Sequence, residues 1–233
     1  MKLSIIVPVY NEEKTILEIL KRLDELSIPK VIKEVIIVDD GSTDSTRKKL
    51  TKIKNAKVIR HDKNKGKGAA VKTGIKEASG DYIIIQDADL EYHPKYIKNL
   101  VSEIEGESSV VYGTRLNRLP HLNKEEKKHL FIFHYFGNRF LSLVTSVLYG
   151  RWITDMETCY KLFPKKAVEK MRINARGFEF EPEITAKLLK SGYKIKEVPI
   201  VATPRGYDQG KKLNTVRDGL KALWYLVKYR FTN

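Results

Sequence analysis

Short apolar runs and amphipathic stretches alternate through the first half of the chain, and this alternation restricts the fold more than any other feature. Apolar runs of strand length lie at residues 3–9, 34–38, 57–60, 82–85 and 109–113. Stretches with the helical spacing of apolar residues lie near residues 12–26, 43–53, 68–78 and 94–104. Strands and helices that alternate in this way form a mostly parallel sheet with helices on both faces. We therefore predict an α/β, Rossmann-like fold.

The second half of the chain is less regular. Its predicted elements are a long helix near residues 124–149, a short strand after residue 160, a helix near 181–190, a strand near 194–201 and a closing helix near 214–230. A basic loop, residues 204–212, precedes the closing helix. No linker-like stretch separates the two halves, so we expect a single domain over residues 1–233.

The composition limits the possible partners. The chain has 233 residues, a formal net charge of +15 and 42% hydrophobic residues, which is typical of one ordered domain. The positive charge suits phosphorylated small molecules or an anionic membrane, and the lysine-rich surface of a heat-adapted protein would also produce it. The basic residues are spread along the chain without a nucleic-acid-binding motif, so we expect no nucleic acid as a partner. A single cysteine, Cys159, suits a reducing compartment.

Polar clusters follow three of the predicted strands. They are Tyr10-Asn11-Glu12, Asp39-Asp40 and Asp87-Ala88-Asp89. Right-handed crossovers place the loops after successive parallel strands along one rim of the sheet, where ligands bind in such folds. Two carboxylates one residue apart are hard oxygen ligands for Mg²⁺ or Mn²⁺, and these ions in turn hold phosphate oxygens. Asp87 and Asp89 thus indicate a nucleotide-diphosphate site, and the alternative is a solvated turn at the strand end.

The loops after the second and third strands add to this prediction. Asp39 can accept a hydrogen bond from a ribose or a base, although an Asp-Gly turn that caps the next helix would show the same residues. Asn11 is a suitable N-cap for the first helix. Glycines and Lys67 open the helix near residue 68, where free backbone N–H groups attract phosphate. This stretch matches neither a dinucleotide-binding fingerprint nor a P-loop.

In their order and spacing, these motifs resemble glycosyltransferase family 2. The segments that carry the resemblance are residues 3–12, 37–44, 80–81 and 87–89. Residues 155–161 and 205–212 are similar to the polyprenyl-phosphate sugar synthases of that family, the group that includes dolichyl-phosphate mannose synthase. The resemblance implies a GT-A fold and an inverting transfer from a nucleotide sugar. It also implies a nucleotide-sugar-binding lobe, residues 1–115, and an acceptor-binding lobe, residues 116–233.

The resemblance further implies roles for individual residues. Asp89 would bind the metal together with Glu91 and Asp87, and Glu91 stands where the mannose synthases carry a glutamine. The residues expected to hold the nucleotide sugar are Pro8, Tyr10, Asn11, Glu12, Asp39, Asp40, Lys67, Asp87, Ala88, Arg205 and Lys211.

Fixed cations and one acid complete the predicted machinery. Arginine binds phosphate bidentately through its planar guanidinium, and we expect Arg115 and Arg139 to hold an acceptor phosphate. The residues expected to take part in catalysis are Asp89, Arg115 and Asp155. Asp155 would be the general base for a hydroxyl acceptor, and its alternative role is a cap or a loop ion pair.

Residues 130–136 and 140–144 form an unusually aromatic stretch. Arg139 interrupts it, and an arginine at the centre of a spanning helix costs about 2.5–3.5 kcal/mol, so we expect no membrane crossing here. We predict either an interfacial helix, with Lys124, Lys127 and Lys128 on anionic headgroups, or a helix buried against the sheet. The same pattern recurs near the C-terminus in Trp224, Tyr225 and Tyr229 with Lys221, Lys228 and Arg230.

These features predict a metal-dependent transferase that uses Mg²⁺ or Mn²⁺. It would move a hexose from a GDP-mannose or UDP-glucose type of donor to a polyprenyl or dolichyl phosphate. The chain begins without a signal peptide, so we expect a cytoplasmic protein bound peripherally to the cytoplasmic face of an anionic membrane. Two alternatives stay open: a family 2 transferase to a glycan hydroxyl with Asp155 as base, and a non-catalytic nucleotide-sugar-binding protein.

Overall fold

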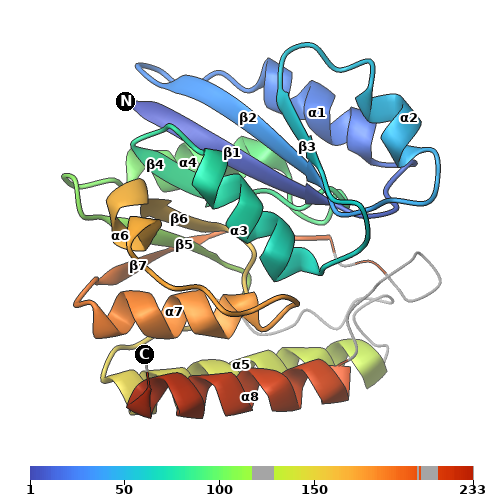
Figure 1. Cartoon of the computed structure of the whole chain (residues 1–233). Coiled ribbons are helices and arrows are strands. Elements are labelled where there is room, and N and C mark those ends of the chain that lie inside the picture. The colour runs from blue at the N-terminus through green and yellow to red at the C-terminus, as the bar shows by residue number, and fades with distance from the viewer. Residues whose placement is uncertain (117–128, 204, 206–214, 233) are drawn as a thin grey trace.

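Figure 1 shows the computed structural model, which describes residues 1–116, 129–203, 205 and 215–232. The strands are β1 (Lys2–Val9), β2 (Ile32–Asp39), β3 (Lys57–Arg60), β4 (Tyr82–Ile85), β5 (Val110–Thr114), β6 (Lys161–Pro164) and β7 (Ile195–Pro199). The helices are α1 (Ile16–Glu25), α2 (Thr46–Leu50), α3 (Lys67–Glu77), α4 (Ile97–Ser102), α5 (His129–Tyr149), α6 (Lys165–Glu169), α7 (Phe180–Lys190) and α8 (Thr215–Phe231), with a 3₁₀ turn η1 (Pro94–Tyr96). The strands predicted in the first half are all present.

The strands form one seven-stranded sheet in the order β3-β2-β1-β4-β6-β5-β7. The pairs β1–β2, β1–β4, β2–β3 and β5–β7 are parallel, whereas β6 runs antiparallel to both of its neighbours, β4 and β5. The predicted mostly parallel sheet is therefore confirmed, and the antiparallel β6 was not expected. Because β6 lies between β4 and β5, the boundary between the two predicted lobes runs through a single sheet.

Both faces of strand β1, which lies between β2 and β4, are covered. Leu3, Ile5, Ile6 and Val7 are all fully buried, and neighbouring residues in a strand point to opposite faces. Helix α3 approaches one face so closely that a Cβ on Gly74 would lie 2.4 Å from Cγ2 of Ile6. Figure 1 shows α3 in front of the sheet and α1 and α4 behind it, as the predicted two-sided arrangement requires.

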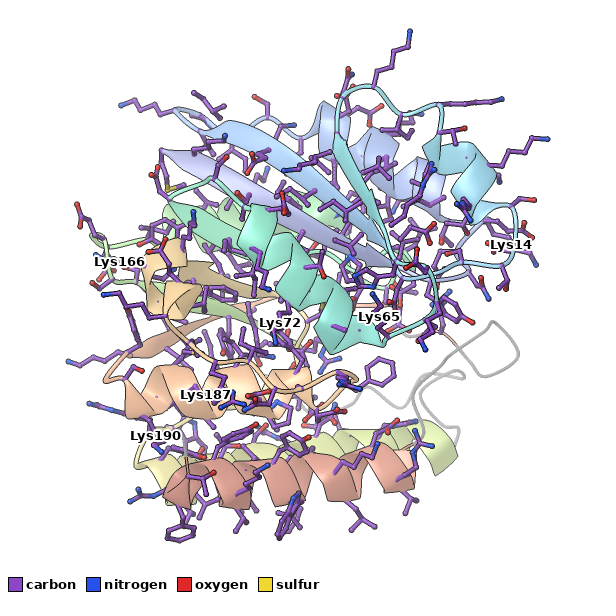
Figure 2. All side chains as sticks on the ribbon, viewed as in Figure 1. Lys14, Lys65, Lys72, Lys166, Lys187 and Lys190 are labelled. Carbon is purple, nitrogen blue, oxygen red and sulfur yellow. The ribbon has the colours of Figure 1, made fainter. Side chains whose placement is uncertain are left out.

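The helices α5, α7 and α8 form a further layer beside the β5–β7 end of the sheet (Figure 1). They enclose a second apolar cluster of Leu141, Ile153, Met156, Leu189, Ala222 and Leu226. Tyr229 of α8 is fully buried, and Nζ of Lys187 on α7, labelled in Figure 2, lies 4.4 Å from the centre of its ring. Tyr229 is thus a core residue and cannot contact a membrane. No helix in the described parts of the chain has the length and apolarity needed to cross a bilayer.

The start of the first helix differs from the prediction. Helix α1 begins at Ile16 with Thr15 as its N-cap residue, so the expected N-cap role of Asn11 is wrong. Asn11 lies in the preceding loop, with a φ of 49°. The physical reason is that the side chain of Asn11 bonds to the neighbouring loop, as described below, and not to the backbone of α1.

The other differences are smaller. Helix α2 is shorter than expected, η1 precedes α4, and the short α6 was not expected. Residues 124–128 of the predicted long helix lie outside the described residues, and of the predicted basic loop only Arg205 is described.

Candidate active site

The loops that follow β1 and β2 are tied to each other at the carboxyl edge of the sheet. Val9 pairs with Asp39, so the two strands end level. Oδ1 of Asn11 accepts a hydrogen bond from the backbone N–H of Thr43 at 2.8 Å, and Oγ of Ser42 accepts one from the backbone N–H of Asn11 at 3.0 Å. Asn11, predicted to bind the nucleotide sugar, thus holds the two loops together.

The two acids at the end of β2 have different surroundings. Asp40 uses both oxygens within the protein: Oδ1 lies 2.6 Å from Nδ1 of His61, and Oδ2 accepts from the backbone N–H of Gly66 at 2.7 Å. Oδ1 of Asp39 accepts from the backbone N–H of Ser42 at 2.9 Å. Asp40 therefore holds the loop before α3, and any effect on a nucleotide would be indirect, whereas Asp39 lies at the strand end with fewer protein partners.

Asp87, two residues after the end of β4, is neutralised by a lysine. Nζ of Lys67, the first residue of α3, lies 2.8 Å from Oδ1 of Asp87 and 3.3 Å from Oε1 of Glu181 on α7. Burial raises the pKa of the Asp87 carboxyl, but the charges of Lys67 and Arg205 and the hydrogen bonds from Lys67 and Cys159 together outweigh burial, and the pKa is lowered overall. Lys67, predicted to contact phosphate, thus already faces two acids, and Asp87, predicted as a metal ligand, faces Lys67.

Asp89 and Glu91 instead face the guanidinium of Arg205. Leu90 between them has a φ of 66°, an uncommon value for leucine, and turns the chain sharply. Nη2 of Arg205 lies 3.2 Å from Oδ2 of Asp89, and Nε of Arg205 lies 3.9 Å from Oε1 of Glu91. Glu12, from the loop after β1, binds both terminal nitrogens of Arg205, at 3.1 and 2.9 Å. Glu12, Asp89 and Glu91, the carboxylate cluster, therefore surround one positive charge.

The carboxylate cluster carries more negative charge than Arg205 can balance. Burial and the charges of Asp87 and Glu91 raise the pKa of Asp89 to about 7, although Arg205 opposes this rise. Hard oxygen donors with excess negative charge suit a divalent cation. Among the described residues no three or more His, Cys, Asp or Glu side chains form a ready metal site. The residues fit a metal whose ligands would be Asp89 and Glu91 once Arg205 has moved.

Arg205 reaches the carboxylate cluster from the second half of the chain. An antiparallel bridge joins Tyr92 to Ala202, and the backbone N–H of Thr203 donates to the carbonyl of Glu91 at 2.9 Å. The backbone N–H of Arg205 donates to Oε1 of Glu91 at 3.1 Å. These contacts place the guanidinium beside acids more than a hundred residues away in sequence, which no local pattern could reveal.

Arg115 and Asp155 form a separate ion pair near the end of β5. Nε and Nη2 of Arg115 donate to the two oxygens of Asp155 at 2.7 Å each, and the backbone N–H of Arg115 adds a bond at 2.9 Å. The side chain of Asp155 is fully buried. Burial lowers the pKa of the Arg115 guanidinium, but the charge of Asp155 and the hydrogen bonds to it, with smaller contributions from neighbouring groups, together outweigh burial and hold that pKa well above its usual value. Of the two roles predicted for Asp155, this geometry favours the loop ion pair.

The remaining predicted site residues lie on several different elements. Pro8 and Tyr10 are partly exposed at the end of β1, and Ala88 is buried between the two acids after β4. Arg139 lies on α5 with its guanidinium 5.9 Å from the centre of an aromatic ring of the same helix. Lys211 lies outside the described residues.

The sequence interpretation missed Lys161 and its partner Glu181. Lys161 is fully buried in β6, and its Nζ donates to the carbonyl of Met156 at 2.8 Å and to Oε2 of Glu181 at 2.6 Å. A buried lysine requires a buried acceptor or acid. Lys161 ends the segment 155–161 and stands between Tyr160 and Leu162 at a short apolar strand, but we predicted no role for it. This pair holds the loop that carries Asp155.

Comparisons with known sequences agree with this geometry. Residues 4–172 match the model of "Glycosyl transferase family 2". A dolichol-phosphate mannosyltransferase of Pyrococcus furiosus is 32% identical over 98% of this chain, which spans 64% of that relative. A UDP-N-acetylglucosamine–dolichyl-phosphate N-acetylglucosaminyltransferase of Methanococcus voltae is 30% identical over 96% of this chain and 94% of its own length.

Solved structures show the same architecture. The glucosyl-3-phosphoglycerate synthase of Mycobacterium tuberculosis, in complex with Mn²⁺, uridine diphosphate and phosphoglyceric acid, matches with a TM-score of 0.71 at 19% identity. The match covers 100% of this chain and 79% of that one, so the fold is the GT-A fold, as predicted. The chain has a GT-A sheet with acidic loops at its carboxyl edge, and the family model matches most of its length. The chain therefore belongs to glycosyltransferase family 2 and is a glycosyltransferase.

Proposed function

We propose that this glycosyltransferase uses Mg²⁺ or Mn²⁺ and transfers a hexose, with inversion, from a nucleotide sugar of the GDP-mannose or UDP-glucose type to a polyprenyl or dolichyl phosphate. The names of two relatives support this acceptor class, because one is a dolichol-phosphate mannosyltransferase and the other a dolichyl-phosphate N-acetylglucosaminyltransferase. The Mn²⁺ and uridine diphosphate bound to the M. tuberculosis enzyme support a metal and a nucleotide. The enzyme would then act at the cytoplasmic face of a membrane.

The proposal of a phosphate acceptor rests on the contacts and burial of Asp155. A hydroxyl acceptor requires a general base with a free oxygen beside the nucleophile. Both oxygens of Asp155 instead accept hydrogen bonds from Arg115, and the side chain is fully buried. A phosphate monoester has its second pKa near 6, so a lipid phosphate reaches the site largely ionised and needs no base. The guanidinium of Arg115, held in place by Asp155, suits such an anion.

The donor would lie across the strand ends. Asp39 would hold the nucleoside, and Asp89 and Glu91 would hold the metal, which when bound would neutralise charge on the leaving diphosphate. Arg205 lies in the same cluster, and its planar guanidinium suits diphosphate oxygens once it leaves the carboxylates. Fixed positive charge near the leaving group stabilises the charge that develops there during the reaction.

The reaction balances without a proton acceptor. An oxygen of the ionised acceptor phosphate attacks the anomeric carbon on the side opposite the diphosphate. The new carbon–oxygen bond forms as the bond to the diphosphate breaks, and its electron pair leaves with the nucleoside diphosphate. Inversion at the anomeric carbon follows from this direction of attack. Asp155 contributes by positioning Arg115.

A transfer assay tests the proposal. The protein would be incubated with Mn²⁺, a polyprenyl phosphate in detergent, and GDP-mannose, UDP-glucose or UDP-N-acetylglucosamine in separate reactions. We expect mass spectrometry of the lipid extract to show a glycosyl-phosphate lipid from one donor, and none with the matching polyprenol or with the Asp89→Ala variant. Transfer to a sugar hydroxyl with none to the lipid phosphate would overturn the proposal in favour of the glycan-hydroxyl alternative.

A further inference from the structure

The helices α5 and α8 lie side by side (Figure 1), and each has an exposed apolar stripe on its outer side. The stripe of α5 consists of Phe136, Phe140, Leu143 and Val147, and that of α8 consists of Val216, Leu220, Trp224, Val227 and Phe231. The spacings of three and four residues place each set on one face of its helix. Eight of these nine side chains are more than half exposed. We call this surface the α5–α8 face.

The same helices already bury another face in the protein. Leu141 and Thr145 of α5, and Ala222, Leu226 and Tyr229 of α8, are buried on the inner sides. A helix of a globular protein needs one apolar face for its core, and large exposed apolar patches mark interaction sites. Figure 2 shows ring-bearing side chains that project from α8 away from the rest of the molecule. Packing within the core does not cover the α5–α8 face, so we expect a partner outside the chain to cover it.

Positive charge borders this face. Arg217, Lys221 and Lys228 are exposed, and each directly follows a member of the α8 stripe in sequence, so they line one side of it. The helix α5 contains no acidic residue, and the one acid of α8, Asp218, has an oxygen 3.6 Å from Nε of Arg217. An apolar stripe with a basic border is typical of a helix that lies in the interface of an anionic bilayer. It suits a second copy of the same face less well, because the two basic borders would repel.

We infer that the α5–α8 face docks on an anionic bilayer, with its apolar stripes in the acyl boundary and its basic border on the headgroups. Both helices begin on the side of the molecule where β1 and β2 end (Figure 1). The carboxyl edge of the sheet would then lie on the same side of the molecule as the N-terminal ends of the two docked helices. The choice of a bilayer rests in part on the proposed acceptor, since a polyprenyl phosphate carries its reactive group at the membrane surface.

Fluorescence gives a direct test, because the chain has two tryptophans and Trp224 is in the α5–α8 face. In a Trp152→Phe background, Trp224 is the single reporter. We expect its emission to shift to the blue with vesicles that contain phosphatidylglycerol, and less with phosphatidylcholine alone. Brominated lipids should quench it.

Paired variants separate the apolar and charged contributions. Phe140→Ser with Leu220→Ser should weaken vesicle binding by at least about tenfold, because two apolar contacts are lost. Lys221→Glu with Lys228→Glu should abolish the preference for anionic vesicles. Leu17→Ser and Lys21→Glu on α1, both exposed and distant from α8 in the fold, are the matched controls and should leave binding unchanged. Nucleotide affinity should remain unchanged in every variant, as a check on folding.

The outcomes distinguish this inference from the proposed function. Vesicle binding that is absent, or that the α5–α8 variants leave unchanged, would overturn the docking face. A dimer in solution that Phe140→Ser with Leu220→Ser converts to a monomer, without vesicle binding by either form, would assign the face to a second copy. Normal docking without transfer to any polyprenyl phosphate would refute the acceptor and keep the face. Transfer to a polyprenyl phosphate in detergent without docking on vesicles would refute the docking face and keep the acceptor.

Discussion

Arg205 and Arg115 bind carboxylates in two regions of the same site, but their charge balance is opposite. Arg205 faces the three acids of the carboxylate cluster, and its side chain is partly exposed. Arg115 faces the single, fully buried Asp155. The first region has three acids to one arginine and can accept a further cation, whereas the single charges of the second balance each other. The same type of ion pair can therefore prepare a binding site in one place and hold a fixed cation in another.

The largest expected effect comes from the carboxylate cluster itself. Asp89→Ala should abolish metal-dependent nucleotide binding, because it removes the acid that contacts Arg205 through Oδ2 and accepts from the backbone N–H of Glu91 through Oδ1. Calorimetry with Mn²⁺ and nucleoside diphosphate measures this, with Glu18→Ala in the surface pair with Arg22 as the control. Unchanged metal-dependent affinity in the Asp89 variant would show that the cluster does not bind the metal.

Breaking the neutral pair should instead reduce stability. Asp155→Asn leaves Arg115 partly buried without its counter-charge, which typically costs about 3–5 kcal/mol in the free energy of unfolding. Replacing both partners, by Arg115→Met with Asp155→Leu, should recover much of this loss in urea unfolding experiments.

The same Asp155→Asn variant also reports on the acceptor. Per folded molecule, its turnover on a lipid phosphate should fall by less than the roughly 10²–10⁴-fold that the loss of a general base costs. A larger defect in a fully folded sample would restore Asp155 as the base.

Asp39→Ala should affect the nucleotide alone. The loss of a hydrogen bond to a charged group costs about 1.5–3 kcal/mol, or roughly one to two decades in affinity. We expect this loss for nucleoside diphosphates with or without the sugar, while Mn²⁺ binding to the free protein stays unchanged. Equal nucleotide affinity in variant and parent would exclude Asp39 from the site.

Arg205→Ala should have effects of opposite sign on the two ligands. Its guanidinium competes with a metal for Asp89 and Glu91, so removing it should raise the Mn²⁺ affinity of the free protein by about tenfold, equivalent to 1.4 kcal/mol. Affinity for the nucleotide diphosphate should fall, because a phosphate-binding group is lost. Electron paramagnetic resonance of Mn²⁺ measures the first effect, and Arg22→Ala is the control. Weaker Mn²⁺ binding in the variant would contradict competition.

The smallest expected effect is a pH dependence. Because burial and neighbouring acids raise the pKa of Asp89 to about 7, metal binding must displace a proton below that pH, so Mn²⁺ affinity should increase between pH 6 and pH 8. Between about pH 4 and 7 the folded protein holds a proton on Asp89 that the unfolded chain has lost, so this contribution to stability falls as pH rises. Asp89→Asn should make the stability profile flatter, and a profile identical to that of the parent would contradict the raised pKa.

The sheet and the position of its acidic loops could be predicted from the sequence because they depend on short-range patterns. Buried parallel strands appear as short apolar runs, and the residues that follow them must lie at the carboxyl edge. Asp39, Asp87 and Asp89 were located in this way, and the order of the motifs identified the family.

Only the tertiary structure decided which of these groups are engaged with one another. Lys67 pairs with Asp87, Asp155 holds Arg115, and Arg205 enters the carboxylate cluster, each through contacts between distant segments. The antiparallel β6 and the inner and outer faces of α5 and α8 were settled in the same way. The physical reason is that charge balance and burial depend on which residues become neighbours in space, and local propensity and spacing carry no record of those long-range pairings.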